Sequence, residues 1–180
     1  MYPRAKFLTA GDTALTVELG DVISPEINRQ VRNLFLALDS QQIPGVIDLV
    51  PTYRSILVNY DPLRLSRSSL ENRLRLLEQH LEKTLVKAAN VIEFPTVYGG
   101  EYGADLEHVA DHHDLTVDEV IHIHSSTDYL VYMMGFTPGF AYLGGLSERI
   151  ATPRLQTPRT AIPAGSVGIA ENQTGVYPVE

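Results

Sequence analysis

The candidate chemistry of this sequence gathers in a stretch from Gly135 to Pro178 that is dense in glycine and proline. Two arginines in it, Arg154 and Arg159, each directly follow a proline, which stiffens the loop around them. The planar guanidinium fork of arginine binds a carboxylate or phosphate through two parallel hydrogen bonds. We therefore expect these arginines to anchor an anionic ligand. Structural bonds to loop carbonyls are the alternative for one or both.

Three more polar residues of this stretch are candidates for ligand binding. Ser166 lies in a Gly-Ser-Val-Gly segment whose successive backbone N–H groups can form an anion-binding nest. A tight turn without a ligand is the alternative that we favour for this segment. The side chains of Gln173 and Tyr177 can hydrogen-bond a small polar substrate, or can instead cap the ends of strands.

Two ionisable residues outside the stretch are candidates for proton transfer. Glu101 lies between Gly100 and Gly103 and suits an acid, a base or a ligand-binding group, or it anchors its loop by accepting backbone N–H bonds. His124 lies near the end of an expected helix, and histidine titrates near neutral pH, so it can shuttle protons. The plain alternative is a histidine cation at the negative end of the helix dipole.

Three further histidines have the spacing of metal ligands. His108 and His112 are four residues apart on an expected helix, and His113 adjoins them. No third ligand and no zinc-protease pattern is evident. We therefore expect a solvated helix face and no metal.

The composition excludes several classes of function. With 22 acidic and 14 basic residues, the net charge of −8 opposes a nucleic-acid or anionic-membrane partner. The absence of cysteine excludes disulfides and thiolate sites. No signal peptide and no membrane-spanning run is visible, so we expect a cytoplasmic protein. The chain has no Gly-x-x-x-x-Gly-Lys phosphate loop and no Gly-x-Ser-x-Gly elbow, so any ATP binds by another scaffold or mainly on a partner.

The first 97 residues predict strand pairs that alternate with helices. Ser24 and Pro25 begin one helix, which should end before Pro44. A second helix is expected from Ser68, with Glu71 completing a capping box and a leucine seam that continues to Leu85. Strands are expected at residues 5–8, 14–19, 46–50, 55–60 and 91–97. This order is typical of a ferredoxin-like α+β sandwich, in which both helices cover one face of the sheet.

The second half predicts two short helices and a strand before the Gly- and Pro-rich stretch. Asp105 caps the first helix, to about His113, and a Thr116–Glu119 capping box begins the second, to about His124. A strand follows over residues 128–135. We place a domain boundary near residues 88–92, which gives domains of residues 1–90 and 91–180.

Five motifs in the second half occur in a recognisable order. They are Tyr98-Gly-Gly-Glu-x-Gly-x-Asp-Leu106, Gly135-Phe-x-Pro-Gly-Phe-x-Tyr-Leu-Gly144, the paired Thr-Pro-Arg segments ending at Arg154 and Arg159, Pro163-Ala-Gly-Ser-Val-Gly-Ile-Ala170, and Gln173-Thr-Gly-x-Tyr-Pro178. Together they resemble the family of the 5-oxoprolinase B subunit, whose members are also known as allophanate hydrolase subunit 1-like or sporulation-kinase-inhibitor-like proteins. The resemblance covers essentially the whole chain.

The resemblance implies a ferredoxin-like domain followed by a cyclophilin-like β-barrel. It also implies a protein that acts together with the A and C subunits to hydrolyse 5-oxoproline to glutamate with hydrolysis of ATP, and that is not active alone. Members of the family continue beyond the Tyr-Pro-x-Glu motif, whereas this sequence stops there. We therefore expect the barrel to be incomplete, with unpaired edges that favour association.

Two other functions remain open at this point. A regulatory protein that inhibits a histidine kinase would use the barrel as a recognition surface, and a carboxyltransferase-like component of urea or allophanate metabolism would need a biotin-bearing partner. A homodimer is also compatible with the sequence.

For the 5-oxoprolinase hypothesis we assign roles as follows. Proton transfer and orientation of substrate or water fall to Glu101, His124 and Gln173. Substrate binding falls to Arg154, Arg159, Ser166 and Tyr177. ATP is the expected cofactor, on a site shared with or carried by a partner.

Overall fold

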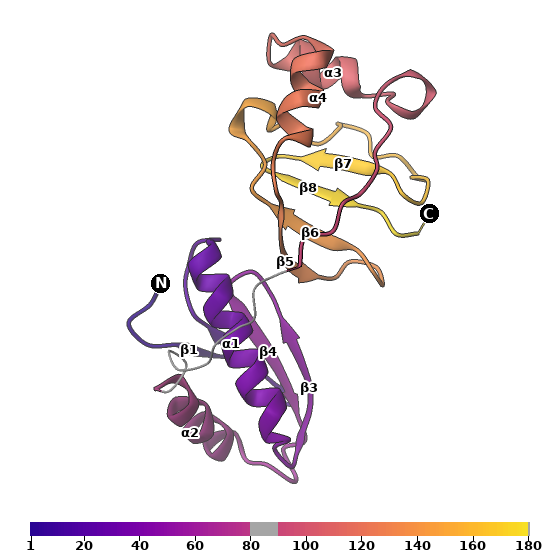
Figure 1. Cartoon of the computed structure of the whole chain (residues 1–180). Coiled ribbons are helices and arrows are strands. Elements are labelled where there is room, and N and C mark those ends of the chain that lie inside the picture. The colour runs from indigo at the N-terminus through magenta and orange to yellow at the C-terminus, as the bar shows by residue number, and fades with distance from the viewer. Residues whose placement is uncertain (80–89, 180) are drawn as a thin grey trace. The chain divides into compact units, whose positions relative to one another are not determined.

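The computed structural model describes residues 1–79 and 90–179, and its contacts divide the chain into two compact units, Met1–Asn90 and Val91–Glu180 (Figure 1). Each unit combines helices with a four-stranded sheet. Every strand pair in both sheets is antiparallel. The predicted α+β fold class is therefore confirmed.

The first unit alternates strand pairs and helices as the sequence predicts. Its elements are β1 (Lys6–Thr9), β2 (Ala14–Glu18), α1 (Pro25–Gln41), β3 (Val46–Pro51), β4 (Ser55–Tyr60) and α2 (Arg67–Glu78). The strands hydrogen-bond in the order β1-β2-β4-β3. Because β2 and β4 lie at the centre of this order, they carry most of the buried sheet residues.

Both helices of the first unit pack on the same face of its sheet (Figure 1). Leu15 and Val17 of β2 pair with Val58 and Ile56 of β4, and directly paired residues point to the same face. All four are buried in one core with apolar residues from both helices, namely Ile27, Val31, Leu34 and Leu38 of α1 and Leu70 and Leu74 of α2. Full burial of such a side chain contributes roughly 1.5–3 kcal/mol, so this shared core holds the helices to the sheet.

Local capping signals begin both helices, but not always at the predicted residue. The Ser24 hydroxyl accepts the backbone N–H of Ile27 at 3.2 Å, as expected. The predicted capping box of Ser68 and Glu71 is wrong, because α2 begins earlier, with Ser66 as its N-cap. Glu71 instead forms an ion pair with Arg67, one turn before it. The predicted continuation of the seam to Leu85 lies outside the described residues.

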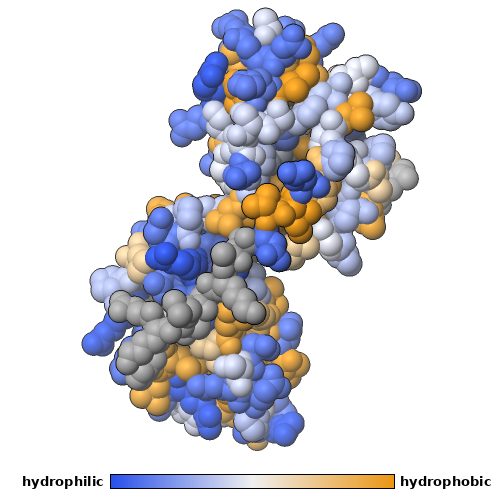
Figure 2. Space-filling view, viewed as in Figure 1, coloured by the Kyte–Doolittle hydropathy of each residue, from blue (hydrophilic) through white to orange (hydrophobic). Residues whose placement is uncertain are grey.

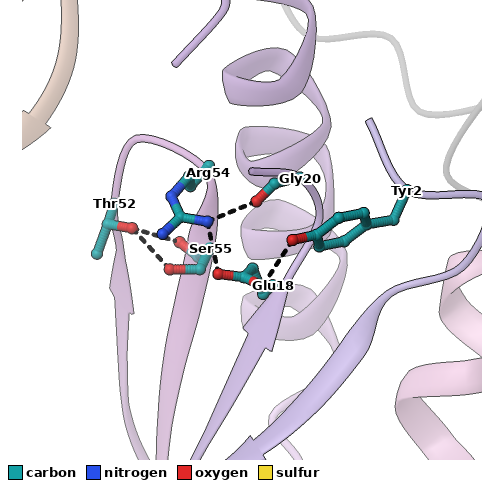
Figure 3. Close-up of polar contacts among 6 residues, drawn as sticks. All are labelled: Tyr2, Glu18, Gly20, Thr52, Arg54 and Ser55. Atoms are coloured by element: carbon teal, nitrogen blue, oxygen red, sulfur yellow. Dashed lines mark hydrogen bonds and ion pairs between the residues drawn. The ribbon is translucent and has the colours of Figure 1, made fainter. Parts of the chain in front are cut away.

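A polar cluster fixes the turn between β3 and β4 to the end of β2 (Figure 3). The Nη1 amino group of Arg54 donates to the Glu18 carboxylate at 2.6 Å and to the carbonyl of Gly20 at 2.8 Å. The Tyr2 hydroxyl donates to the other Glu18 oxygen at 3.1 Å. Buried Asn28 of α1 donates to two carbonyls of the same turn. The Glu18 side chain is only 14% exposed, so these partners take the place of the water that its carboxylate has lost.

The second unit has two α-helices, which precede the strands of its sheet. Its elements are η2 (Gly100–Tyr102), α3 (Leu106–His112), α4 (Val117–Ser125), β5 (Leu130–Met134), β6 (Ala141–Gly144), η3 (Glu148–Ile150), β7 (Val167–Ala170) and β8 (Gln173–Val176). The strands hydrogen-bond in the order β5-β6-β8-β7. Over the described residues this sheet is open, as expected for an incomplete barrel, while its cyclophilin-like character stays a prediction.

The start of α4 confirms a predicted capping box. The backbone N–H of Glu119 donates to the Thr116 hydroxyl at 3.2 Å, and the backbone N–H of Thr116 donates to the Glu119 carboxylate at 2.8 Å. The hydrogen bonds that the Glu119 carboxylate accepts from the Thr116 backbone N–H and hydroxyl hold the pKa of Glu119 below its usual value. The signal was readable because all its atoms lie within four consecutive residues.

The predicted strand at residues 91–97 is wrong. The segment has no strand assignment, and none of the described strands pairs with it. Its apolar side chains are instead exposed, with Val91, Ile92, Phe94 and Val97 each at least 65% accessible. Apolar side chains also reach the surface elsewhere in both units (Figure 2). A strand-forming composition makes a strand only where a second strand takes its hydrogen bonds.

No helix in the described ranges has the length and apolar character needed to cross a membrane.

The polar cluster at Glu18 gives a test of the first unit. We expect Arg54→Met to lower the free energy of unfolding by about 1.5–3 kcal/mol, because it leaves the poorly exposed Glu18 carboxylate without its charged partner. Urea unfolding measures this change. Arg73→Met, at an exposed position of α2, is the matched control and should alter stability by less than about 0.5 kcal/mol. Equal effects of the two changes would contradict this role for Arg54.

Candidate functional site

The sheet of the second unit has two different faces. Ile169 of β7 pairs with Thr174 of β8, so both point to one face. On that face Ile169 packs against the core of α3, α4 and η3, and Thr174 hydrogen-bonds to a side chain of α4. The helices therefore cover this face. The neighbouring residues in each strand, Gly168 and Gly175, point to the opposite face.

Aromatic rings lie over glycines on that opposite face. A Cβ atom added at Gly144 would lie 2.1 Å from the ring of Tyr132, and one added at Gly175 would lie 2.8 Å from the ring of Phe140. Only glycine accepts rings at these distances. The Phe140 ring in turn makes edge-to-face contacts with Tyr142 and Tyr177, at centroid distances of 5.0 and 5.1 Å. This glycine-aromatic face is the side of the sheet on which the predicted binding residues fall.

Three predicted site residues belong to the glycine-aromatic face by strand alternation. Gln173 and Tyr177 are two residues before and after Gly175, and Ser166 is two residues before Gly168. Ser166 and Tyr177 are adjacent, since the Tyr177 backbone N–H donates to the Ser166 carbonyl at 2.9 Å. Gln173 lies roughly 13 Å farther along the strand, at about 3.3 Å per residue. The face thus brings Ser166 and Tyr177 together and leaves Gln173 at its other end.

The segment around Ser166 forms a turn. The Ser166 backbone N–H donates to the carbonyl of Pro163 at 3.1 Å, and the Gly165 N–H donates to the carbonyl of Tyr177 at 2.6 Å. Gly165 has a φ of +86°, which favours glycine in a turn of this kind. Both N–H groups have backbone partners, so this segment matches the tight turn that we favoured over an anion nest.

His124 lies at the centre of a chain of hydrogen bonds beneath the helix-covered face of the sheet. Its Nε2 is 3.1 Å from the Thr174 hydroxyl, and its Nδ1 is 2.7 Å from the Tyr98 hydroxyl. Thr174 donates its own proton to the Gly168 carbonyl at 3.0 Å. Its oxygen therefore accepts from His124, which places a proton on Nε2 and leaves Nδ1 to accept from Tyr98.

The surroundings of His124 favour its neutral form. The residue is 8% exposed, and this burial lowers the pKa of the imidazole. Burial likewise raises the pKa of the Tyr98 hydroxyl, and raises the pKa of Tyr129 to about 12. Tyr129 donates its hydroxyl proton to the His124 carbonyl at 2.7 Å. The network joins α4 to β8 and to the segment before η2, so the geometry gives His124 a structural position.

Arg159 makes a bidentate ion pair with Asp105. Its two terminal nitrogens lie 2.5 and 2.6 Å from the two carboxylate oxygens. The hydrogen bonds from Arg159 lower the pKa of Asp105, and those same bonds raise the pKa of Arg159. Both side chains are more than 40% exposed. This is the carboxylate-binding geometry that the sequence predicts for the arginine, with a carboxylate of the chain itself as partner.

The remaining candidates lie apart from this pair. Arg154 is exposed, and no hydrogen bond or ion pair of its side chain is present within the described parts of the chain. Glu101 is exposed on η2, also without such a partner there. His113 bonds to Thr152 at 3.2 Å. Residues 1–79 and 90–179 contain no group of three His, Asp or Glu side chains that could hold a metal.

Several residues of these arrangements were not predicted as such. Sequence reasoning used Asp105 as a helix cap, and missed both Tyr98 and Thr174 as partners of His124. The sequence separations explain this, since 54 residues separate Arg159 from Asp105 and 50 separate His124 from Thr174. The only available signal was that each of these partners lies inside one of the five motifs.

The chain matches the family described as carboxyltransferase domain, subdomain C and D, over residues 5–180. The 5-oxoprolinase B subunit of Haemophilus influenzae is 58% identical over 167 residues, which are 93% of this chain and 76% of the relative. The 5-oxoprolinase B subunit of Bacillus subtilis is 40% identical in an alignment of 189 positions, gaps included, that covers 99% of this chain and 79% of the relative. The chain therefore belongs to this family, as its motifs indicated.

Solved structures share the fold. TTHA0988 is 36% identical with a TM-score of 0.81; the match covers 92% of this chain but 32% of TTHA0988, so the chain spans about a third of that protein. The urea carboxylase of Kluyveromyces lactis has a TM-score of 0.79 over 99% of this chain and 19% of its own length. At 19% identity, that likeness shows the fold alone.

The His124 network predicts a pH dependence of stability. Burial lowers the pKa of His124 in the folded chain, whereas in the unfolded chain this pKa keeps its ordinary value of about 6.5. Just below pH 6.5 the unfolded chain therefore binds more protons than the folded chain does. The contribution of neutral, buried His124 to the free energy of unfolding is therefore complete above pH 6.5. It is lost as the pH falls toward the folded-state pKa. We expect His124→Gln to cost about 1–2 kcal/mol at pH 8 and to weaken the fall in stability below pH 6.5.

Urea unfolding of the purified chain between pH 8 and pH 5 measures this dependence. His122→Gln is the matched control, because His122 is an exposed histidine of the same helix. An unchanged pH profile in His124→Gln, or the same change in both variants, would overturn the assignment.

Proposed function

We propose that this chain is the B subunit of a 5-oxoprolinase, which cleaves 5-oxoproline to L-glutamate with hydrolysis of ATP. The observation that carries the proposal is the match to proteins named as the B subunit of 5-oxoprolinase, at 40–58% identity over 93–99% of this chain. The reaction adds one water across the lactam C–N bond, so that the carbon becomes a carboxylate and the nitrogen an amine. A second water is consumed as ATP becomes ADP and phosphate.

The A and C subunits complete the enzyme in this proposal. The name of the relatives denotes one component of a larger enzyme. We place ATP on a partner, or between a partner and this chain, because the sequence has no phosphate-binding loop. The three components work together in the cytoplasm.

The geometry supports a carboxylate-anchoring role for Arg159. Its guanidinium already binds a carboxylate through two short bonds, and 5-oxoproline presents a carboxylate beside its lactam. Arg154 lies on the same loop with an exposed head group and supplies a second positive charge. Ser166 and Tyr177, next to each other at one end of the glycine-aromatic face, are the polar groups that we assign to the lactam.

The proposed acid–base roles differ among the candidates. Glu101 keeps its role as a group that orients or activates water, because its carboxylate is exposed on η2. His124 becomes a positioning residue, since both its ring nitrogens have partners and it holds β8 in place. Gln173 lies at the far end of the same face, too far from Ser166 and Tyr177 for one small lactam to contact all three, so we assign it no contact with the lactam.

Reconstitution with each component omitted in turn tests the proposal. We expect 5-oxoproline-dependent ATP hydrolysis only when this chain is mixed with the A and C subunits. Arg159→Gln should lower kcat/KM roughly 10- to 150-fold, the effect of losing hydrogen bonds to a charged group, and Arg154→Gln should lower it less. Arg149→Gln removes an exposed arginine of η3 and should leave turnover unchanged. Turnover without this chain, or full turnover in both loop variants, would refute the proposal.

A further inference from the structure

The loop that carries both arginines is fixed firmly at its two ends. At its beginning, Thr152 forms a bridge with Glu171 and its hydroxyl contacts His113. At its end, Ser166 and Gly165 hydrogen-bond to Tyr177. Between these ends, the pair with Asp105 is the one side-chain hydrogen bond or ion pair present within the described structure. The Arg159–Asp105 pair is thus a single latch in the middle of the loop.

Asp105 gives up a helix cap to make this pair. It occupies the N-cap position of α3, where an aspartate normally accepts a backbone N–H from the first turn. Here its carboxylate makes no such bond, and its backbone angles of −106° and 1° are not those of an extended N-cap. Thr116 of α4 and Ser24 of α1 both make the capping bond that Asp105 lacks. Asp105 therefore has a second, local use for its carboxylate.

By general rules, the two interactions open to the Asp105 carboxylate contribute free energies of the same order. An ion pair whose side chains are both more than 40% exposed contributes little, because water screens it. An N-cap hydrogen bond has a similar worth. A carboxylate from outside the chain can therefore replace Asp105 at Arg159 while Asp105 turns to cap α3, and neither charge is left without a partner.

We propose that Asp105 is a built-in competitor for the carboxylate-binding site of Arg159, and that a ligand carboxylate opens the latch by moving Asp105 to the N-cap of α3. This rests on the proposed function in so far as the ligand is 5-oxoproline. The site takes a small carboxylate, and the loop that carries Arg159 is released from α3 when the ligand binds. Binding at the site and the start of α3 are thereby coupled.

Titration of the full chain with 5-oxoproline, followed calorimetrically or by NMR, tests the competition. Asp105→Asn removes the competing charge but keeps a good N-cap, so we expect it to bind 5-oxoproline about twofold to fivefold more tightly than the natural chain does. Arg159→Gln should weaken the binding roughly 10- to 150-fold. Pyrrolidin-2-one, which has the lactam without the carboxylate, should bind the natural chain and Asp105→Asn equally. Unchanged or weaker binding of 5-oxoproline by Asp105→Asn would overturn the competition.

Hydrogen exchange at the start of α3 tests the second half of the latch. In the natural chain, 5-oxoproline should slow exchange of the Glu107 and His108 amides, because the released Asp105 caps them. In Asp105→Ala, residue 105 can neither pair with Arg159 nor cap α3. The ligand should then bind tightly without slowing hydrogen exchange of these amides. Equal protection in the natural chain and Asp105→Ala would refute the exchange of partners.

The same titration with succinate separates the latch from the proposed function. Tighter binding of succinate by Asp105→Asn, together with no binding of 5-oxoproline, would uphold the latch and refute 5-oxoproline as the substrate. A complex that hydrolyses ATP with 5-oxoproline, but whose KM does not fall in Asp105→Asn, would uphold the function and refute the latch. Failure of every carboxylate to bind the natural chain and Asp105→Asn alike would overturn the latch outright.

Discussion

The arrangement of the second unit depends on the hydrogen bonds that His124 makes on both sides of its ring. They join α4 to the central strand β8 through Thr174, and to the segment before η2 through Tyr98. A buried imidazole with one unsatisfied nitrogen would cost roughly 1–3 kcal/mol, so these partners fix the distance between the helix and the sheet. The packing of α4 on one face of these strands therefore also fixes the position of the opposite, glycine-aromatic face.

With the sheet fixed in this way, the loop between β6 and β7 can bear an exposed and weakly held charge. Rigid ends at Thr152 and Ser166 limit where Arg159 can reach, although the arginine itself stays accessible. An arginine buried in the sheet would bind a carboxylate at a large desolvation cost. An arginine on an unanchored loop would lose more conformational entropy on binding. The observed position lies between these extremes.

The sequence predicted well whatever depends on neighbouring residues. The Ser24 cap and the Thr116–Glu119 box each lie within a few residues, and both formed. Prediction failed where a distant residue decided the outcome. Residues 91–97 have the composition of a strand but lack a described strand to pair with. The partners of His124 are distant in the same way, and only the fold reveals them. The start of α2 is a different case, because Ser66 and Ser68 are close neighbours and the local pattern did not identify Ser66 as the N-cap.

Asp105 shows how a local signal can be correct and still incomplete. The sequence correctly marks it as the N-cap of α3, yet a residue 54 positions away takes its carboxylate in the structure. The carboxylate can bond to the first turn of α3 or to Arg159. If the two contacts have similar free energies, the one that forms depends on what else is bound to Arg159. The five motifs hold both partners, Asp105 in the first and Arg159 in the third. Two accessible partners suit the ligand exchange that we propose for Arg159, because a single strong pair would block binding and a missing partner would leave the arginine's charge uncompensated.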